Sequence, residues 1–184
     1  IDFNSLAWVK DNFFDSCAKN NIRLDIITGN HDIHFKNTNK INSPSLLLRE
    51  YPLIRVYDEI CDIVCDGLKI TLCPWINIEN QNDIFSHINK TDSKVLFGHL
   101  EINGFESHHG HYYSGGLDSE LFSKFKKVFS GHFHSKSTKG NITYLGNPYQ
   151  LYWGDYGDER GFHIFDTETL SLDFVKNPYT LFHK

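Results

Sequence analysis

The sequence KVFSGHFH, residues 127–134, decides how the chain is organised, because a short β-forming run stops at a glycine that is followed at once by histidine. KVLFGH at residues 94–99 repeats this order, and the β-rich residues 22–27 lead in the same way into TGNHD at residues 28–32. Three strands are therefore each expected to end in a loop that carries a glycine and a histidine. Because ligands of α/β sheets gather at the carboxyl ends of the strands, we expect these loops to form one site.

Between these strands, apolar residues recur at helical spacing. Helices are predicted at residues 3–20, 83–89 and 120–125, and a loop is predicted across the polar residues 37–45. Further β-rich runs predict strands of meanders: residues 53–57, 60–64 and 68–73 in the middle of the chain, and residues 142–145, 161–165 and 170–175 near its end. The alternation indicates the α/β class, as a sandwich of two mixed sheets with helices outside them.

Composition excludes several classes of protein. A chain of 184 residues, of which 40% are hydrophobic, can bury the core of one domain and is neither a disordered tail nor a fibre. No apolar run approaches the roughly 18 residues of a membrane span, so we expect a cytoplasmic protein with no membrane partner. The net charge of −5 gives no support for broad electrostatic binding of nucleic acid. The four cysteines match no metal or redox spacing and predict buried free thiols.

Histidine is the informative excess. Of eleven histidines, eight fall in four short places: His31 and His34; His99; His108, His109 and His111; His132 and His134. Such clustering points to metal or proton chemistry. A hydrolytic centre with two metal ions needs neutral imidazoles together with carboxylate or amide oxygens, and the strand-end loops offer Asn30, His99, His132 and His134 for this purpose. His132 and His134 alternate along the chain, so the turn after Ser130 must bring both of them to the same site.

These motifs resemble a known family. GNHD at residues 29–32, GH at 98–99 and GHFH at 131–134 are similar to the third, fourth and fifth motifs of the calcineurin-like metallophosphoesterases. YLGNPY at residues 144–149, GD at 154–155 and RGFHIFD at 160–166 resemble the SbcD-type DNA nucleases, and most closely the phage recombination-related endonuclease subunits. The resemblance spans nearly the whole chain. It departs at Asn147, where such nucleases more often have serine or threonine.

The resemblance implies a four-layer αββα sandwich with mixed sheets and one phosphoesterase domain over residues 1–184. The family's first two motifs, Asp-x-His and Gly-Asp-x-x-Asp, have no counterpart in residues 1–28, and the chain opens on Ile1 and contains no methionine. We therefore expect a piece that lacks the amino-terminal strands of the domain. Residues 167–184 would begin the connection to a capping and partner-binding region.

The resemblance also implies roles for single residues. Asn30, His99 and His132 would bind one divalent ion, and His134 would bind the second; manganese is the expected metal. His31 would protonate the leaving oxygen or stabilise charge on the phosphoryl group, and Asp32 would orient the ring of His31. Candidates for substrate binding are His109, Asn147 and Tyr149.

The implied function is that of a metal-dependent DNA exonuclease and endonuclease subunit in recombination or repair. Its expected partners are DNA, an SMC-like ATPase of the SbcC type and a second copy of the nuclease. A bias toward Asn, Ile and Lys is typical of an AT-rich genome such as that of a phage, which would place the protein in the host cytoplasm. We expect the 184-residue chain alone to be inactive. Two alternatives stay open: a phosphatase or cyclic-nucleotide phosphodiesterase of the same superfamily, and a catalytically incomplete module that binds DNA or the ATPase.

Several other patterns keep two interpretations. The basic residues around Lys124, Lys126 and Lys127 would contact a DNA backbone or form a solvated face. The aromatic residues 149–153 would stack on bases or pack in an interface. His87 and His163 are expected to pack as ordinary side chains.

Overall fold

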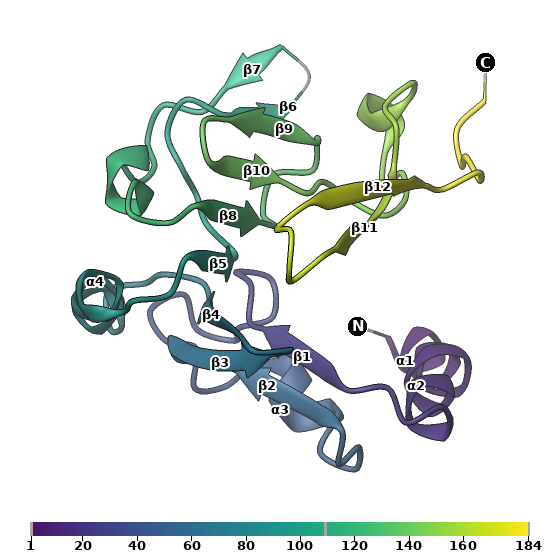
Figure 1. Cartoon of the computed structure of the whole chain (residues 1–184). Coiled ribbons are helices and arrows are strands. Elements are labelled where there is room, and N and C mark those ends of the chain that lie inside the picture. The colour runs from purple at the N-terminus through teal and green to yellow at the C-terminus, as the bar shows by residue number, and fades with distance from the viewer. Residues whose placement is uncertain (1, 109, 184) are drawn as a thin grey trace.

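A computed structural model describes residues 2–108 and 110–183 of the chain (Figure 1). Its centre is a six-stranded mixed sheet in the order β3-β4-β5-β8-β10-β9. The strands are β3 (Cys61–Cys65), β4 (Leu68–Cys73), β5 (Val95–Gly98), β8 (Lys127–Ser130), β9 (Ser137–Lys139) and β10 (Ile142–Tyr144). β4, β5, β8 and β10 run parallel, whereas β3 and β9 are antiparallel to their neighbours at the two edges. The carboxyl ends of the parallel strands therefore meet at one edge of the sheet.

Two strand pairs cover one face of this sheet. β1 (Leu24–Ile27) pairs in parallel with β2 (Ile54–Tyr57), and β11 (Gly161–Phe165) pairs antiparallel with β12 (Leu172–Lys176). The core between the layers is built from Ile70, Leu72, Val95 and Phe129 of the central sheet, with side chains of both pairs packed against them. These residues alternate along their strands, which is how a strand buries one face.

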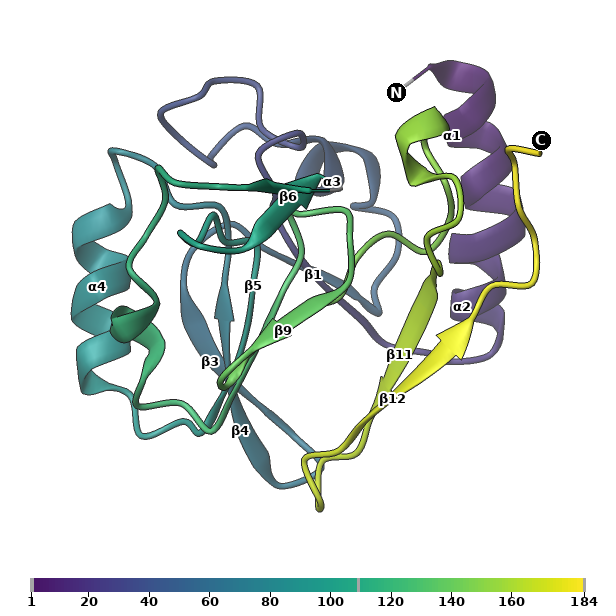
Figure 2. The same cartoon turned by 90° about the horizontal axis from the view of Figure 1, so that it is seen from above.

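Helices and turns cover the outside. α4 (Gln81–Lys90) contributes Ile84 and Ile88 to a second core on the other face of the central sheet. The amino-terminal helix lies on the opposite side of the molecule from α4 (Figures 1 and 2). It consists of α1 (Phe3–Val9), a π-helical turn η1 (Lys10–Phe14) and α2 (Asp15–Lys19). The remaining elements are α3 (Ser43–Leu47), β6 (Glu106–His108), β7 (His111–Tyr112), and the 3-10 turns η2 (Ser119–Phe122) and η3 (Trp153–Asp155).

The α/β class and the mixed sheets are confirmed, as are the predicted helices over residues 3–20 and 83–89 and every predicted strand. Among the residues that the structure describes, all four cysteines are free, although Cys61 and Cys65 are only half-buried. No helix within the described ranges is both long and apolar enough to cross a membrane.

Each predicted meander is confirmed in one antiparallel pairing, β3 with β4 and β11 with β12, and is wrong in the other. β2 pairs with β1 in the outer layer rather than with β3. In this pair, Leu24 lies opposite Ile54 and Ile26 lies opposite Val56. β10 pairs with β8 and β9 in the central sheet and not with β11. In each case the connecting segment crosses from one layer to the other, and sequence periodicity does not report such a crossing.

Two local predictions are also wrong. Residues 120–125 form only the short 3-10 turn η2, because the chain must enter β8 directly afterwards, where Lys126 N donates to Lys94 O (2.8 Å). The end of the predicted loop 37–45 begins the helix α3. Asn42 caps this helix by accepting a hydrogen bond from Ser45 N (2.8 Å), and Pro44 lies in its first turn, a start signal that was present in the sequence.

Candidate functional site

Three strand ends converge as predicted. Gly98 lies opposite Ser130 in the register of β5 and β8, and Gly131 N donates to Gly98 O at 3.0 Å. The loop after β1 joins them because Trp75 N, just after β4, donates to Thr28 O at 2.8 Å. The glycine and histidine loops at residues 28–32, 98–99 and 131–134 therefore form one edge of the sandwich.

His99 occupies the centre of this cluster. Its Nε2 lies 2.9 Å from Asn30 Oδ1, across 69 residues of sequence. Glycines make room for the ring: a Cβ at Gly29 would lie 2.8 Å from His99 Cε1, and one at Gly131 would lie 3.1 Å from His99 Nδ1. Side chains at either glycine would push against the imidazole, which explains why the motif needs them.

His132 lies beside His99 on a strained backbone. Its φ of +79° falls in the left-handed region, which non-glycine residues rarely adopt, and such strain is concentrated at functional sites. Residues 132–135 bend after β8 instead of continuing as a strand. His132 and His134 are therefore not held on opposite faces of a strand. The ring centroids of His132 and His99 are 5.3 Å apart, and His132 Nε2 lies 3.4 Å from Glu101 Oε1.

The cluster favours neutral imidazoles. Burial, together with the nearby His132, His31 and His134, lowers the pKa of His99 to about 4. Burial also lowers the pKa of His132, and the Glu101 carboxylate opposes this shift. Both side chains therefore keep a nitrogen lone pair at neutral pH, as metal ligation requires.

His134 is positioned differently from its neighbours. Its Nδ1 lies 3.1 Å from Tyr152 Oη, and its carbonyl oxygen accepts a hydrogen bond from Asn147 N (3.0 Å). Gly146, at a φ of +73°, brings the two segments together; a Cβ there would lie 3.0 Å from His134 O.

His31 and Asp32 have different surroundings in the structure. His31 is exposed at the cluster, within electrostatic reach of His99 and His132. The Asp32 carboxylate accepts a hydrogen bond from Gly29 N (2.8 Å) and so shapes the turn that carries Asn30. Among the described residues Asp32 makes no hydrogen bond to His31, and the orienting role stays a prediction.

The three candidates for substrate binding fare unequally. His109 lies outside the described residues. Tyr149 is 51% exposed and belongs to an exposed aromatic segment with Tyr152 and Trp153. Asn147 Nδ2 is buried, and the structure gives it no hydrogen-bond partner within the described ranges. An unsatisfied buried donor is unfavourable by about 1–3 kcal/mol, so a ligand that accepts from it would bind favourably.

Sequence reasoning missed Trp75 and Glu101. The Trp75 ring centroid lies 5.3 Å from that of His132 and 6.1 Å from that of His99. A cavity of about 430 Å³ opens beside the cluster, with Trp75, Gln81, His99 and Glu101 among its walls. Trp75 follows the end of β4, as the histidines follow β5 and β8, and that shared position was the signal that could have found it.

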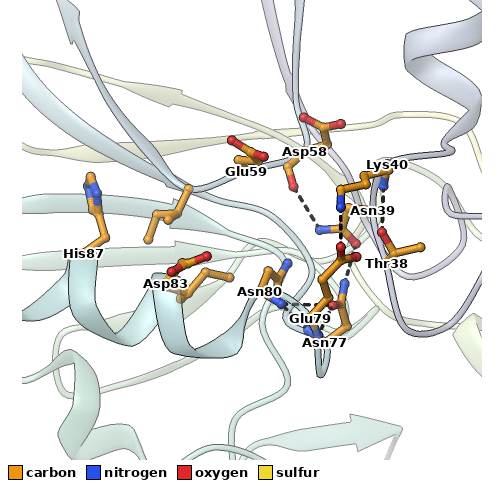
Figure 3. A pocket seen from close by; sticks show the side chains of 12 residues that line it. Thr38, Asn39, Lys40, Asp58, Glu59, Asn77, Glu79, Asn80, Asp83 and His87 are labelled. Atoms are coloured by element: carbon orange, nitrogen blue, oxygen red, sulfur yellow. Dashed lines mark hydrogen bonds and ion pairs between the residues drawn. The ribbon is translucent and has the colours of Figure 1, made fainter.

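Asn39, Asn77 and Asn80, which Figure 3 draws, form a polar network that holds the backbone of Trp75 in place. Trp75 O accepts hydrogen bonds from Asn39 Nδ2 (2.8 Å) and Asn80 Nδ2 (3.0 Å), and Asn77 Nδ2 donates to Asn39 Oδ1 (2.9 Å). These amides line a second cavity of about 360 Å³, over which Lys40 pairs with Glu79. The network therefore connects this second cavity with the histidine cluster through the segment that carries Trp75.

Other sequence candidates are structural. Lys124 is exposed, and its Nζ donates to Ile88 O, Asn89 O and Thr91 O at the carboxyl end of α4, a structural contact that neither of its two interpretations included. His87 packs with its Nε2 2.9 Å from Asp62 Oδ1, and the His163 ring packs at a tilt against Phe174, with their centroids 5.1 Å apart; both are ordinary packed side chains as predicted.

The donor set can be compared with what a metal ion needs. Within the described ranges, no three His, Cys, Asp or Glu side chains are grouped so that they could hold a metal ion by themselves. The set that converges instead combines an amide oxygen with two imidazoles: Asn30, His99 and His132. Neutral imidazole and amide oxygen are ligands that divalent transition metals accept, so the chemistry of this set fits such an ion.

The fold and the site together define an α/β protein with a histidine-rich site at the carboxyl ends of parallel strands. A comparison with known protein families finds no match for this chain. The chain is 42% identical, over 159 residues, to the protein named exonuclease subunit 1 of Enterobacteria phage T4, and the alignment covers 86% of this chain. It covers 47% of that relative, so the chain spans about half the length of the curated protein it matches.

Proposed function

We propose that this chain is part of a metal-dependent DNA nuclease subunit that hydrolyses phosphodiester bonds in recombination or repair. The observation that carries the proposal is the Asn30–His99–His132 cluster, assembled from three strand ends of a protein that is 42% identical to a phage exonuclease subunit. The name of the relative favours DNA over the small phosphoesters of the other enzymes in the calcineurin-like superfamily. The fold proposed with it is the four-layer metallophosphoesterase sandwich.

Each side chain has a role in this proposal. Asn30, His99 and His132 would hold one divalent ion and His134 a second, with manganese as the expected metal. When bound, the ions would activate water and neutralise charge on the phosphoryl oxygens. His31, exposed next to His99, would donate a proton to the leaving oxygen. The cavity beside Trp75 and His99 would receive the scissile end of the DNA, with Asn147 and Tyr149 as further contacts.

The proposal extends to partners. The relative is named a subunit, which supports association with another protein. An SMC-like ATPase of the SbcC type and a second nuclease copy are the proposed partners.

Metal binding is tested first, by titrating the chain with Mn²⁺ and following free Mn²⁺ by electron paramagnetic resonance. His99→Gln should weaken binding by at least about tenfold, because it replaces the central imidazole of the cluster. His163→Gln, in a histidine that packs on β11 away from the cluster, serves as the matched control. Equal affinities in the two variants would refute the assigned metal site.

Hydrolysis is tested on end-labelled duplex DNA with Mn²⁺, using the 184-residue chain and the complete product of its gene in parallel. We expect the complete product to cut and the chain to cut negligibly, since only His134 of the described residues is proposed to hold the second ion. In the complete product, His31→Ala should lower the turnover of DNA hydrolysis while leaving the affinity for Mn²⁺ unchanged. Hydrolysis of bis-p-nitrophenyl phosphate but not of DNA would favour a phosphatase or phosphodiesterase, and DNA binding without hydrolysis would favour a binding module.

A further inference from the structure

A buried ion pair lies in the connection between β10 and β11. Arg160 Nη2 is 2.8 Å from Asp155 Oδ1, and both side chains are only 4% exposed. The same nitrogen is 3.0 Å from Asp158 Oδ2, which also accepts from Ser135 Oγ (3.1 Å). A buried ion pair adds little net stability by itself because its charges must be desolvated. The ion pair therefore matters for the groups that it positions.

The pair holds His134 from the backbone side. Arg160 Nη1 donates to His134 O, the carbonyl that also accepts from Asn147 N. A guanidinium can make these contacts simultaneously because it presents several donors in a fixed plane, which a lysine does not.

The same pair holds Tyr152. Asp155 Oδ2 accepts hydrogen bonds from Leu151 N (2.7 Å) and Tyr152 N (3.4 Å), which fixes the turn η3. Tyr152 Oη in turn lies 3.1 Å from His134 Nδ1. Both partners of the Tyr152–His134 hydrogen bond are thus anchored, through their backbones, to one guanidinium–carboxylate pair.

We propose that Arg160, Asp155 and Tyr152 form a positioning unit that sets the orientation and the tautomer of His134. His134 Nδ1–H donates to Tyr152 Oη, and Nε2 keeps the lone pair. This inference rests on the proposed function, in which His134 binds a divalent ion, because a histidine ligates through its unprotonated nitrogen while the other nitrogen is held by a hydrogen bond. It also gives a role to Asp155 and Arg160, two residues of the sequence motifs to which the proposed hydrolysis assigns none.

The tautomer is directly measurable in the metal-free 184-residue chain. Two-bond ¹H–¹⁵N correlation spectra should show His134 protonated on Nδ1. Tyr152→Phe removes one hydroxyl and should convert His134 mainly to the Nε2–H form, which an imidazole side chain prefers in water. Tyr179→Phe, the same change at a tyrosine that is 80% exposed, should leave the spectrum of His134 unchanged. An Nε2–H tautomer in the wild type, or an unchanged tautomer in Tyr152→Phe, would overturn the proposal.

The contribution of the ion pair is tested with Arg160→Lys, which keeps the charge but loses the planar fork. In a folded Arg160→Lys protein we expect a mixture of the two tautomers, and a pure Nδ1–H form would exclude the ion pair from the unit. If Arg160→Lys does not fold, Tyr152→Phe still decides whether Tyr152 sets the tautomer, and Asp155→Asn replaces Arg160→Lys as the test of the pair.

Metal affinity separates this proposal from the proposed function. In the complete gene product, His134→Ala should weaken Mn²⁺ binding, and Tyr152→Phe should weaken it about tenfold. Full Mn²⁺ affinity in His134→Ala would refute the ligand role itself. Weak binding in His134→Ala together with full affinity in Tyr152→Phe would leave the ligand role intact and refute the positioning unit.

Discussion

His99 shows how single residues in this site are tuned by their surroundings. The ring fills the space left by Gly29 and Gly131 and receives the amide oxygen of Asn30. Burial and three other histidines keep its pKa near 4, so the residue is neutral where a free histidine begins to protonate. An imidazole in this environment is prepared to ligate a cation and is poorly suited to carry a proton at neutral pH.

The lowered pKa of His99 predicts that the stability of the metal-free chain depends on pH. The folded pKa of His99 is about 4 against 6.5 for an ordinary histidine, so the unfolded state binds the proton first as the pH falls. The free energy of unfolding should therefore decrease between pH 6.5 and pH 4, by about 3 kcal/mol from this residue.

Urea unfolding at pH 7, 5.5 and 4 measures this decrease. His99→Gln cannot take up the proton and should show a correspondingly smaller loss than the wild type. Parallel curves for the two proteins would contradict the assignment of a low pKa to His99.

At the scale of elements, strand ends carry the site. β1, β5 and β8 each end at a glycine or within two residues of one, and the residues that follow converge because the strands are parallel or held by cross-layer hydrogen bonds such as Trp75 N to Thr28 O. α4, by contrast, ends at the opposite edge of the sheet, where the chain enters β5, and carbonyl groups at its end accept hydrogen bonds from outside the helix. Three of them accept from Lys124, a cation at the negative end of the helix dipole.

Lys124→Met should therefore destabilise the protein although Lys124 lies at the surface. The substitution leaves carbonyl oxygens at the end of α4 without their donor, and we expect a loss of about 1–2 kcal/mol. Lys126→Met is the matched control, since Lys126 is also exposed and lies only two residues further along. Chemical denaturation of the two variants should separate them, and equal midpoints would show that the contacts of Lys124 add nothing.

At the scale of the whole molecule, an aromatic cluster joins the two layers. The ring centroid of Phe129 in the central sheet lies 4.9 Å from that of Phe97 and 5.2 Å from that of Phe165, which belongs to β11 in the outer layer. Among the described residues, none of the hydrogen bonds or ring contacts of the histidine cluster comes from β11 or β12. Their attachment through Phe165 nevertheless fixes where the connection from β10 ends, and hence where Arg160 and Tyr152 stand.

Phe129→Ala should accordingly destabilise the protein by about 3–5 kcal/mol, because it leaves a cavity between the layers. Phe162→Ala, on the same β11 strand as Phe165 but with Phe162 58% exposed, should change stability by no more than about 0.5 kcal/mol. The urea concentrations at the unfolding midpoints of Phe129→Ala, Phe162→Ala and the wild type measure these changes. A small loss in Phe129→Ala would mean that the two layers do not depend on this cluster.

Local chemistry made the elements and the core of the site predictable. β-branched and aromatic runs that stop at glycine define β1, β5 and β8, and the four ligand candidates follow them in the sequence. The errors have a common cause. η2 and the pairings of β2 and β10 depend on how the chain crosses between layers, and long-range packing overrode the local pattern there.

The sequence by itself determined the strands, their glycine ends and the histidines that follow them, because propensity and turn chemistry act between neighbours in the chain. Only the tertiary structure decided that Asn30 meets His99 across 69 residues, that His132 takes a left-handed backbone, and that Tyr152 and Arg160 hold His134. Those relations arise from contacts between distant segments. Their free energy depends on which layers pack together, and no short stretch of sequence encodes it.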